Sequence, residues 1–105
     1  MIVRTWRCRA TAAKAEEYHR YITGTVFAHL ATIDGHRGVQ LLRRELDGEI
    51  EFVALSFWDS YDAVREYAGD YIDTAMVQPE AQAMLSHFDT FADHYELAHT
   101  TIGEG

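Results

Sequence analysis

The sequence of 105 residues contains one cysteine, one proline and no asparagine. A lone cysteine, Cys8, excludes an internal disulfide and any zinc site built from several cysteines. We interpret Cys8 as a small, buried or half-buried side chain on the first strand. No low-complexity tract or internal repeat interrupts a composition that is 48% hydrophobic and 25% charged. These features predict one globular domain spanning residues 1–105.

The chain also lacks an apolar run of membrane-spanning length and the apolar core of a signal peptide. We therefore expect a cytoplasmic protein. Basic residues are scarce, since nine of them stand against 17 acids and leave a formal net charge of −8. This balance argues against nucleic acid or an anionic membrane as a partner. Six of the nine bases fall on the first two strand-like segments, at Arg4, Arg7, Arg9, Arg37, Arg43 and Arg44.

The stretch 49–68, EIEFVALSFWDSYDAVREYA, changes its hydrophobic period at Trp58. Up to Trp58 it is apolar on both faces, which is typical of a central strand covered on both sides. From Asp59 onward apolar residues recur at helical spacing, with Asp59 as the predicted start of a helix. Upstream, Asp47-Gly48 predicts a two-residue hairpin turn. That turn would place Arg37 opposite Trp58.

The remaining elements follow from the same periodicities. Residues 1–9 alternate as a strand, and a helical stripe with Thr11 as N-cap runs to Ile33, with a bend or close approach possible at Gly24. Pro79 suits the first position of another helix, which would carry Phe88 on its apolar side. Residues 91–97 alternate as a last strand, and residues 98–105 form a loose tail. The order predicts a ferredoxin-like α+β fold, a βαββαβ antiparallel sheet with helices on one face.

The helices of this fold cover only one face of the sheet, and the uncovered face is apolar. Val53, Leu55 and Phe57 lie on that face together with Leu42. Contiguous exposed apolar patches mark interfaces. We therefore expect a homodimer in which two sheets meet face to face.

The chain up to about Leu97 resembles the antibiotic biosynthesis monooxygenase (ABM) family within the dimeric α+β barrel superfamily. The similarity is carried by FVALSFWDSYDAVREYAG, by the preceding DGHRGVQLLRRELDGEIEF and by the closing HFDTFADHYEL. The resemblance implies a homodimeric barrel with a pocket in each subunit between the helices and the sheet. Members of the family include cofactor-independent monooxygenases that oxidise polycyclic phenols to quinones, and haem-degrading monooxygenases.

The resemblance also assigns positions. Trp58 stands where the quinone-forming enzymes have a tryptophan, Ala54 where they have an asparagine and Val64 where they have a tyrosine. In haem-degrading relatives a tryptophan takes the place of Tyr67, and a haem-ligating histidine follows about ten residues later. The nearest histidine here is His87, further downstream.

These observations define one candidate ligand pocket and leave two functions open. The candidate residues are Trp58, Arg37, Arg43, Trp6, Arg4, Tyr67 and His87. One hypothesis is a cofactor-independent monooxygenase acting on a small aromatic or phenolic substrate. The other is a non-catalytic, small-ligand-binding or accessory protein on the same scaffold. A haem-binding or haem-degrading relative is favoured less than either. No catalytic residue, cofactor site or metal site is assigned, because the histidines and acids of residues 87–96 do not have the spacing of metal ligands.

Overall fold

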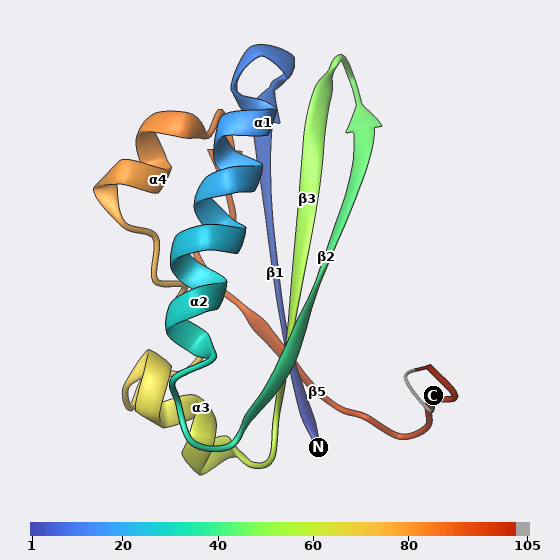
Figure 1. Cartoon of the computed structure of the whole chain (residues 1–105), viewed down its shortest axis with the longest axis vertical. Coiled ribbons are helices and arrows are strands. Elements are labelled where there is room, and N and C mark those ends of the chain that lie inside the picture. The colour runs from blue at the N-terminus through green and yellow to red at the C-terminus, as the bar shows by residue number, and fades with distance from the viewer. Residues whose placement is uncertain (103–105) are drawn as a thin grey trace.

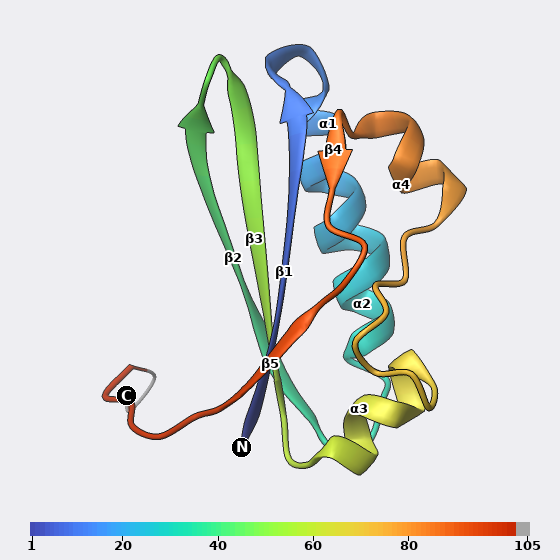
Figure 2. The ribbon, with the colours of Figure 1, turned by 180° about the vertical axis from the view of Figure 1, so that it is seen from behind.

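A computed structural model, which describes residues 1–102, shows an antiparallel sheet with the helices on one side (Figure 1). The strands are β1 (Ile2–Thr11), β2 (His36–Leu46), β3 (Glu49–Trp58), β4 (His87–Phe88) and β5 (Asp93–Glu96). The helices are α1 (Ala12–Tyr21), the π-helix η1 (Ile22–Val26), α2 (Phe27–Leu30), α3 (Tyr61–Ala68) and α4 (Pro79–Met84). The strand order is β2-β3-β1, with β4 and β5 both paired to β1 (Figure 2). The predicted ferredoxin-like α+β fold is confirmed.

The hairpin between β2 and β3 turns at Asp47-Gly48, as predicted. Both residues have positive φ, 54° at Asp47 and 80° at Gly48, which is the backbone conformation of a type I′ turn. Beyond the turn the strands keep the predicted register, with Leu41 opposite Ala54. The turn therefore sets which face each side chain of β3 occupies.

The register prediction is wrong at the start of β2. A bulge between His36 and Gly38 places His36, and not Arg37, opposite Trp58. Because a bulge adds one residue to one strand, Arg37 leaves the alternation and lies exposed. Its Nε and Nη2 donate hydrogen bonds to the Asp59 carboxylate at 2.7 and 2.5 Å. Arg37 is therefore a surface residue.

The bulge follows a close approach between the loop before β2 and helix α3. At Gly35 the φ angle is 86°, and an added Cβ would lie 2.6 Å from the Cβ of Ala63. A side chain at Gly35 would clash there and would also strain the backbone. The Gly35 carbonyl accepts a hydrogen bond from the Asp59 N–H at 2.8 Å. This contact fixes the start of β2 relative to the end of β3.

Helix α3 begins one residue later than predicted. Ser60 is the N-cap, and its hydroxyl oxygen accepts a hydrogen bond from the Ala63 N–H at 3.2 Å. Asp59 does not cap the helix, because its carboxylate is paired with Arg37.

The helical segment after β1 contains a π-helical turn. In η1 the N–H of Phe27 bonds the carbonyl of Ile22, five residues earlier. Gly24 lies inside this turn, and no atom lies within 4 Å of a Cβ added there, so the close approach predicted as one possibility is absent. Such turns are frequent at functional sites. The segment ends at Leu30, three residues before the predicted Ile33.

The last third of the chain departs most from the prediction. Pro79 begins α4 as expected, but the helix ends at Met84, and Phe88 lies in β4. The reason is that the backbone pairs with β1 immediately after the helix, where the Ser86 N–H donates to the Arg9 carbonyl at 2.9 Å. Hydrogen bonds to the edge of β1 thus replace those that a longer helix would have formed.

The predicted final strand is also interrupted. Phe91 forms an isolated bridge with Thr74, and the Ala92 N–H donates to the Asp73 carbonyl at 2.8 Å. This segment therefore pairs with the irregular link 69–78 before β5 joins β1. Residues 98–102 have no helix or strand. The rest of the predicted tail, residues 103–105, lies outside the described residues.

The core consists of two clusters. One lies below α1 and α4 and is centred on Cys8, Tyr18 and Phe52. The other lies at the α3 end and is centred on Trp58 and Val64. The apolar face of each helix is thereby buried against one side of the sheet.

Candidate functional site

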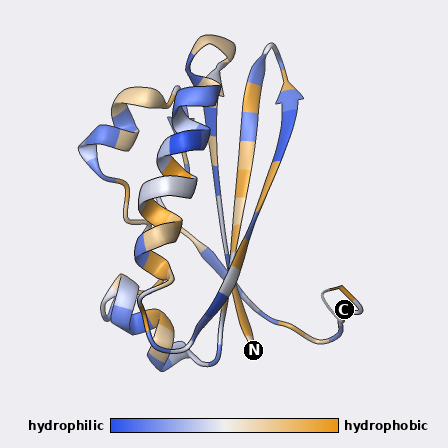
Figure 3. Cartoon of the chain, in the orientation of Figure 1, coloured by the Kyte–Doolittle hydropathy of each residue, from blue (hydrophilic) through white to orange (hydrophobic). Residues whose placement is uncertain are grey.

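A cavity of about 270 Å³ lies between the sheet and the helical layer. Residues of β1 and β3 line one side of it, α1, η1 and α2 another, and the link 69–78 with α4 a third. Its lining is largely aromatic and aliphatic, with Trp6, Tyr18, Tyr21, Phe27, Leu30 and Tyr67 among its residues. Hydrophobic residues are frequent along η1, α2 and the middle of β3 (Figure 3). A concave, mostly apolar cavity with few polar groups is the usual form of a small-molecule site.

The sheet side of the cavity is set by the β1–β3 register. Arg4 lies opposite Ser56, and Trp6 lies opposite Ala54. All four residues line the cavity. The indole N–H of Trp6 donates to the Asp89 carbonyl at 2.7 Å, which holds the Trp6 ring in place. The two cross-strand pairs, Arg4 with Ser56 and Trp6 with Ala54, thus form the sheet side of the cavity.

Arg4 carries the one arginine side chain in the cavity lining, and its residue is only 6% exposed. The guanidinium donates from Nη1 to the carbonyl of Ile72 and from Nη2 to the carbonyl of Thr74, the latter at 3.1 Å. Within residues 1–102 it forms no ion pair with a carboxylate. Burial lowers the pKa of Arg4, but an arginine remains charged in proteins. The cavity therefore contains a buried cation.

His94 of β5 lies opposite Arg4 in the β1–β5 pairing. Its Nε2 lies 2.9 Å from Nη1 of Arg4, and its Nδ1 lies 3.2 Å from Oδ1 of Asp73. Burial and the neighbouring Arg4 charge lower the pKa of His94, while Asp73 raises it. Because the lowering causes dominate, His94 is neutral at neutral pH.

Tyr67 of α3 forms another part of the cavity lining. The Arg4 guanidinium carbon lies 5.9 Å from the centroid of its ring, within the range of a cation–π contact. Burial raises the pKa of the Tyr67 phenol, and Arg4 opposes that rise. The phenol is therefore protonated at neutral pH and offers one donor and one acceptor.

The helical side of the cavity includes residues of the π-turn. Ile22, Thr25 and Val26 of η1 all line the cavity, next to Tyr18 and Tyr21 of α1. Thr25 and Val26 follow Ile22 by three and four residues, which is the spacing of one helical face. Burial raises the pKa of Tyr18. The pKa of the neighbouring Cys8 thiol is raised to about 12, mainly by burial.

The structure brings together three of the seven candidate residues. Arg4, Trp6 and Tyr67 all line the cavity. Trp58 is fully buried behind it, where its indole N–H donates to the Ser56 hydroxyl at 2.9 Å. Trp58 therefore contacts the lining residues and does not itself line the cavity.

The other three candidates lie elsewhere. Arg37 is paired with Asp59 at the surface. Arg43 lies 5.3 Å above the Phe52 ring and forms an ion pair with a carboxylate of α1. His87 is exposed on β4, 3.5 Å from Asp89. None of these three side chains lines the cavity.

Several lining residues were not among the sequence candidates. Tyr18 belongs to the predicted apolar stripe, and its periodicity alone indicates only burial. Tyr21 and Ser56 have no sequence signal that separates them from core or surface residues. His94 does not line the cavity but contacts Arg4. Its one possible sequence signal is a position on the same sheet face as Arg4, and that position is known only from the β1–β5 pairing.

Two features are absent from the described residues. Residues 1–102 contain no group of three or more histidine, cysteine, aspartate or glutamate side chains that could hold a metal ion. No helix in the same part of the chain is long and apolar enough to cross a membrane.

The fold resembles that of several solved structures. The haem-degrading protein MhuD of Mycobacterium tuberculosis, solved with two haems in its active site, aligns with a TM-score of 0.65 at 17% identity over 95% of this chain and 98% of its own. The N63A mutant of SnoaB, a cofactor-independent oxygenase of Streptomyces nogalater, aligns with a TM-score of 0.64 at 18% identity over 96% of both chains. A Bacillus cereus protein provisionally assigned as an antibiotic biosynthesis monooxygenase aligns with a TM-score of 0.64 at 14% identity over 94% of this chain and 92% of its own.

Comparisons at the level of sequence find no relative. No family model and no curated protein matches the chain. At such low identities the structural matches establish the fold alone. The chain thus has the same ferredoxin-like α+β fold as these three proteins.

Proposed function

We propose that the chain is a cofactor-independent monooxygenase of the ABM type, and that its cavity binds a compact aromatic substrate as the phenolate. The observation that carries this proposal is the position of Arg4, a buried cation in the wall of an aromatic cavity, without a carboxylate partner among residues 1–102. Burying an unpaired charge is costly. An anionic ligand would offset that cost.

The cavity residues suit the chemistry of an electron-rich phenol. A guanidinium at the oxygen of the ligand stabilises the phenolate, which is the form that reacts with dioxygen. The aromatic walls hold the ring flat and exclude water. In the overall reaction a ring CH₂ or its enol loses two hydrogens, one oxygen atom of O₂ becomes a carbonyl oxygen and the other leaves as water.

The cavity residues do not favour a haem. At about 270 Å³ it falls below the range of about 300–1,000 Å³ typical of sites for drug-sized ligands, and a porphyrin is larger than most of those. His29, exposed on α2, is the one histidine in the lining. A haem-binding role is therefore not part of the proposal.

One observation favours a second candidate, a binding protein without turnover. Ala54 lines the cavity at the position where the resemblance expects an asparagine. An alanine methyl group cannot donate a hydrogen bond to an oxygen intermediate. Under this alternative the cavity would bind the same aromatic anion and release it unchanged.

Oxygen consumption separates the two functions. Anthrols would be supplied to the purified protein, with product analysis and with or without added flavin or haem. The proposal predicts quinone formation that needs no additive and is lost in Arg4→Met. The matched control is Arg65→Met, since Arg65 is an exposed arginine of α3 paired with Asp62. Saturable binding without oxygen uptake would support the second candidate.

We also propose that two copies of the chain associate through the outer face of the sheet. The helices gather on the other side (Figures 1 and 2), and Val53, Leu55 and Phe57 remain partly exposed on this one. Leu42 is 50% exposed and Tyr95 is 58% exposed. An apolar face of this kind is stabilised when a second sheet covers it.

A further inference from the structure

We propose that His94 and Asp73 are positioning residues, which orient the Arg4 guanidinium in the cavity and make the site select anionic over neutral aromatic ligands. This inference rests on the proposed function of the cavity. Neither residue lines the cavity, so each would act through Arg4.

Arg4 determines which nitrogen of His94 accepts a hydrogen bond and which one donates. An arginine has only donors, so Nε2 of His94, 2.9 Å from Nη1 of Arg4, must accept. The proton of the neutral imidazole is then on Nδ1, which donates to Oδ1 of Asp73 at 3.2 Å. The His94 side chain is 4% exposed, whereas that of Asp73 is 77% exposed. Asp73 thus anchors the buried ring from the surface.

The bonds that Arg4 makes leave its Nε–H without a partner among residues 1–102. Nη1 donates to the carbonyl of Ile72 and to His94, and Nη2 donates once, to the carbonyl of Thr74. Of the five N–H donors, the Nε–H and one Nη2–H have no partner among residues 1–102. The Nε–H lies beside Nη2 on one edge of the planar group, and this edge, where the Nε–H is free, can bind an oxyanion through two parallel hydrogen bonds.

The same bonds couple Arg4 to the cavity wall. Ile72 and Thr74 belong to the link 69–78, whose next residues, Ala75 to Gln78, line the cavity. The link is held in turn by the hydrogen bond from Ala92 to Asp73. If His94 no longer accepts from Nη1, the guanidinium can rotate toward the remaining carbonyls, and its free edge would turn away from the ligand.

The test compares two ligands of nearly equal shape, 2-naphthoate and its neutral amide 2-naphthamide, by isothermal titration calorimetry. The wild-type protein should bind the naphthoate more tightly. His94→Leu, which removes the acceptor, should weaken naphthoate binding about tenfold and leave naphthamide binding within about twofold. His94→Gln, whose amide oxygen can accept from Arg4, should restore most of the naphthoate affinity.

Further variants keep the result decisive if His94→Leu does not fold. Asp73→Ala alters an exposed side chain and should weaken naphthoate binding several-fold, whereas Asp93→Ala, the neighbouring exposed acid, should not. If the affinities for both ligands fall equally, or if none of these changes lowers the naphthoate affinity, the positioning role is overturned and the proposed function is left intact. If the wild-type protein binds neither ligand, the proposed function and this inference both fail.

Discussion

The phenol ring of Tyr67 stacks on the indole of Trp58, with ring centroids 6.1 Å apart and planes inclined by 23°. Tyr67 lines the cavity, whereas Trp58 is fully buried beneath it. The Trp58 ring also packs against the His36 ring, with ring centroids 4.9 Å apart. Trp58 therefore supports the site from the core.

This relationship predicts different consequences for the two tryptophans. Trp58→Phe should lower the free energy of unfolding by about 1–3 kcal/mol, because it leaves a void and frees the Ser56 hydroxyl. Ligand affinity should change little. Trp6→Phe should instead weaken aromatic ligand binding roughly threefold to tenfold. Urea unfolding and calorimetric titration of both variants measure the two effects, and the reverse pattern would place Trp58 at the ligand.

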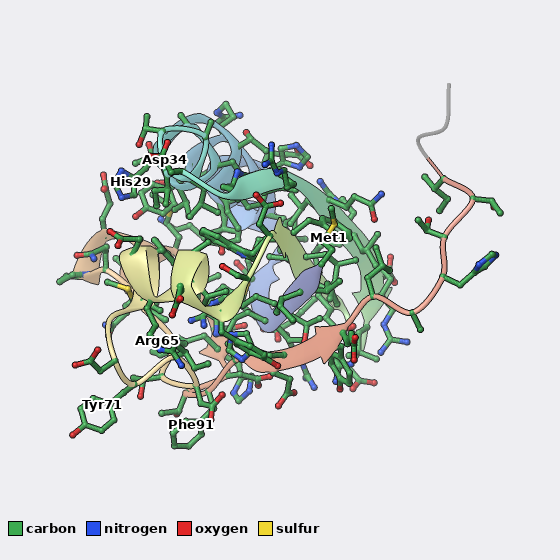
Figure 4. The ribbon with its side chains drawn as sticks, turned by 90° about the horizontal axis from the view of Figure 1, so that it is seen from below. Met1, His29, Asp34, Arg65, Tyr71 and Phe91 are labelled. Atoms are coloured by element: carbon green, nitrogen blue, oxygen red, sulfur yellow. The ribbon has the colours of Figure 1, made fainter. Side chains whose placement is uncertain are left out.

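The proposed dimer predicts that a charge on the outer sheet face changes the molecular mass in solution. Leu55→Asp should convert the dimer to monomer or aggregate, since a carboxylate would be buried between two apolar faces. Tyr71→Asp is the control, because Tyr71 is 84% exposed and projects from the link beside α3 (Figure 4). Light scattering checks both. An unchanged mass for Leu55→Asp would argue against this interface.

Acidification should lower stability before the carboxylates titrate. Burial lowers the pKa of both His36 and His94 in the folded protein. In the unfolded chain each titrates near about 6.5, so below that pH the unfolded state binds more protons and stability falls as the pH falls. Urea midpoints at about pH 7.5 and about pH 5.5 test this. His94→Gln should reduce the difference, and an unchanged difference would show that His94 does not contribute.

The surroundings of two glycines predict opposite effects of alanine substitution on stability. Gly35→Ala should cost more than about 1 kcal/mol, because φ is 86° and the new Cβ would clash with Ala63. Gly24→Ala should stabilise by up to about 1 kcal/mol, since it lies in a helical turn with no atom within 4 Å of the added Cβ. Thermal unfolding measures both. A tolerated Gly35→Ala would mean that the close approach does not set the bulge.

The parts of the fold that the sequence predicts are those determined by local chemistry. Asp47-Gly48 specifies its turn because both residues tolerate positive φ, and the turn sets the register of β2 on β3. The bulge at Arg37 could not be predicted in this way. It depends on Gly35 meeting Ala63, which is 28 residues away in the sequence and belongs to another element.

The same distinction applies to the site. Arg4 and Trp6 follow from strand alternation, and Tyr67 follows from helical spacing, so the sequence alone identifies all three. The role of His94 depends on β5 pairing with β1 across 90 residues of sequence. The π-turn is equally hidden, because no pattern in ITGTV distinguishes it from an α-helical turn.

The central claim, that Arg4 makes the cavity a site for phenolates, can be measured directly with 4-nitrophenol, a phenol that ionises near neutral pH and is yellow only as the anion. Absorbance titrations with saturating protein give the pKa of the bound phenol. A nearby guanidinium lowers a phenol pKa, and an apolar cavity without one raises it. The account predicts a bound pKa about one unit below that of free 4-nitrophenol in the wild-type protein and in Arg65→Met, and a raised pKa in Arg4→Met. An unchanged or raised pKa in the wild-type protein would contradict it.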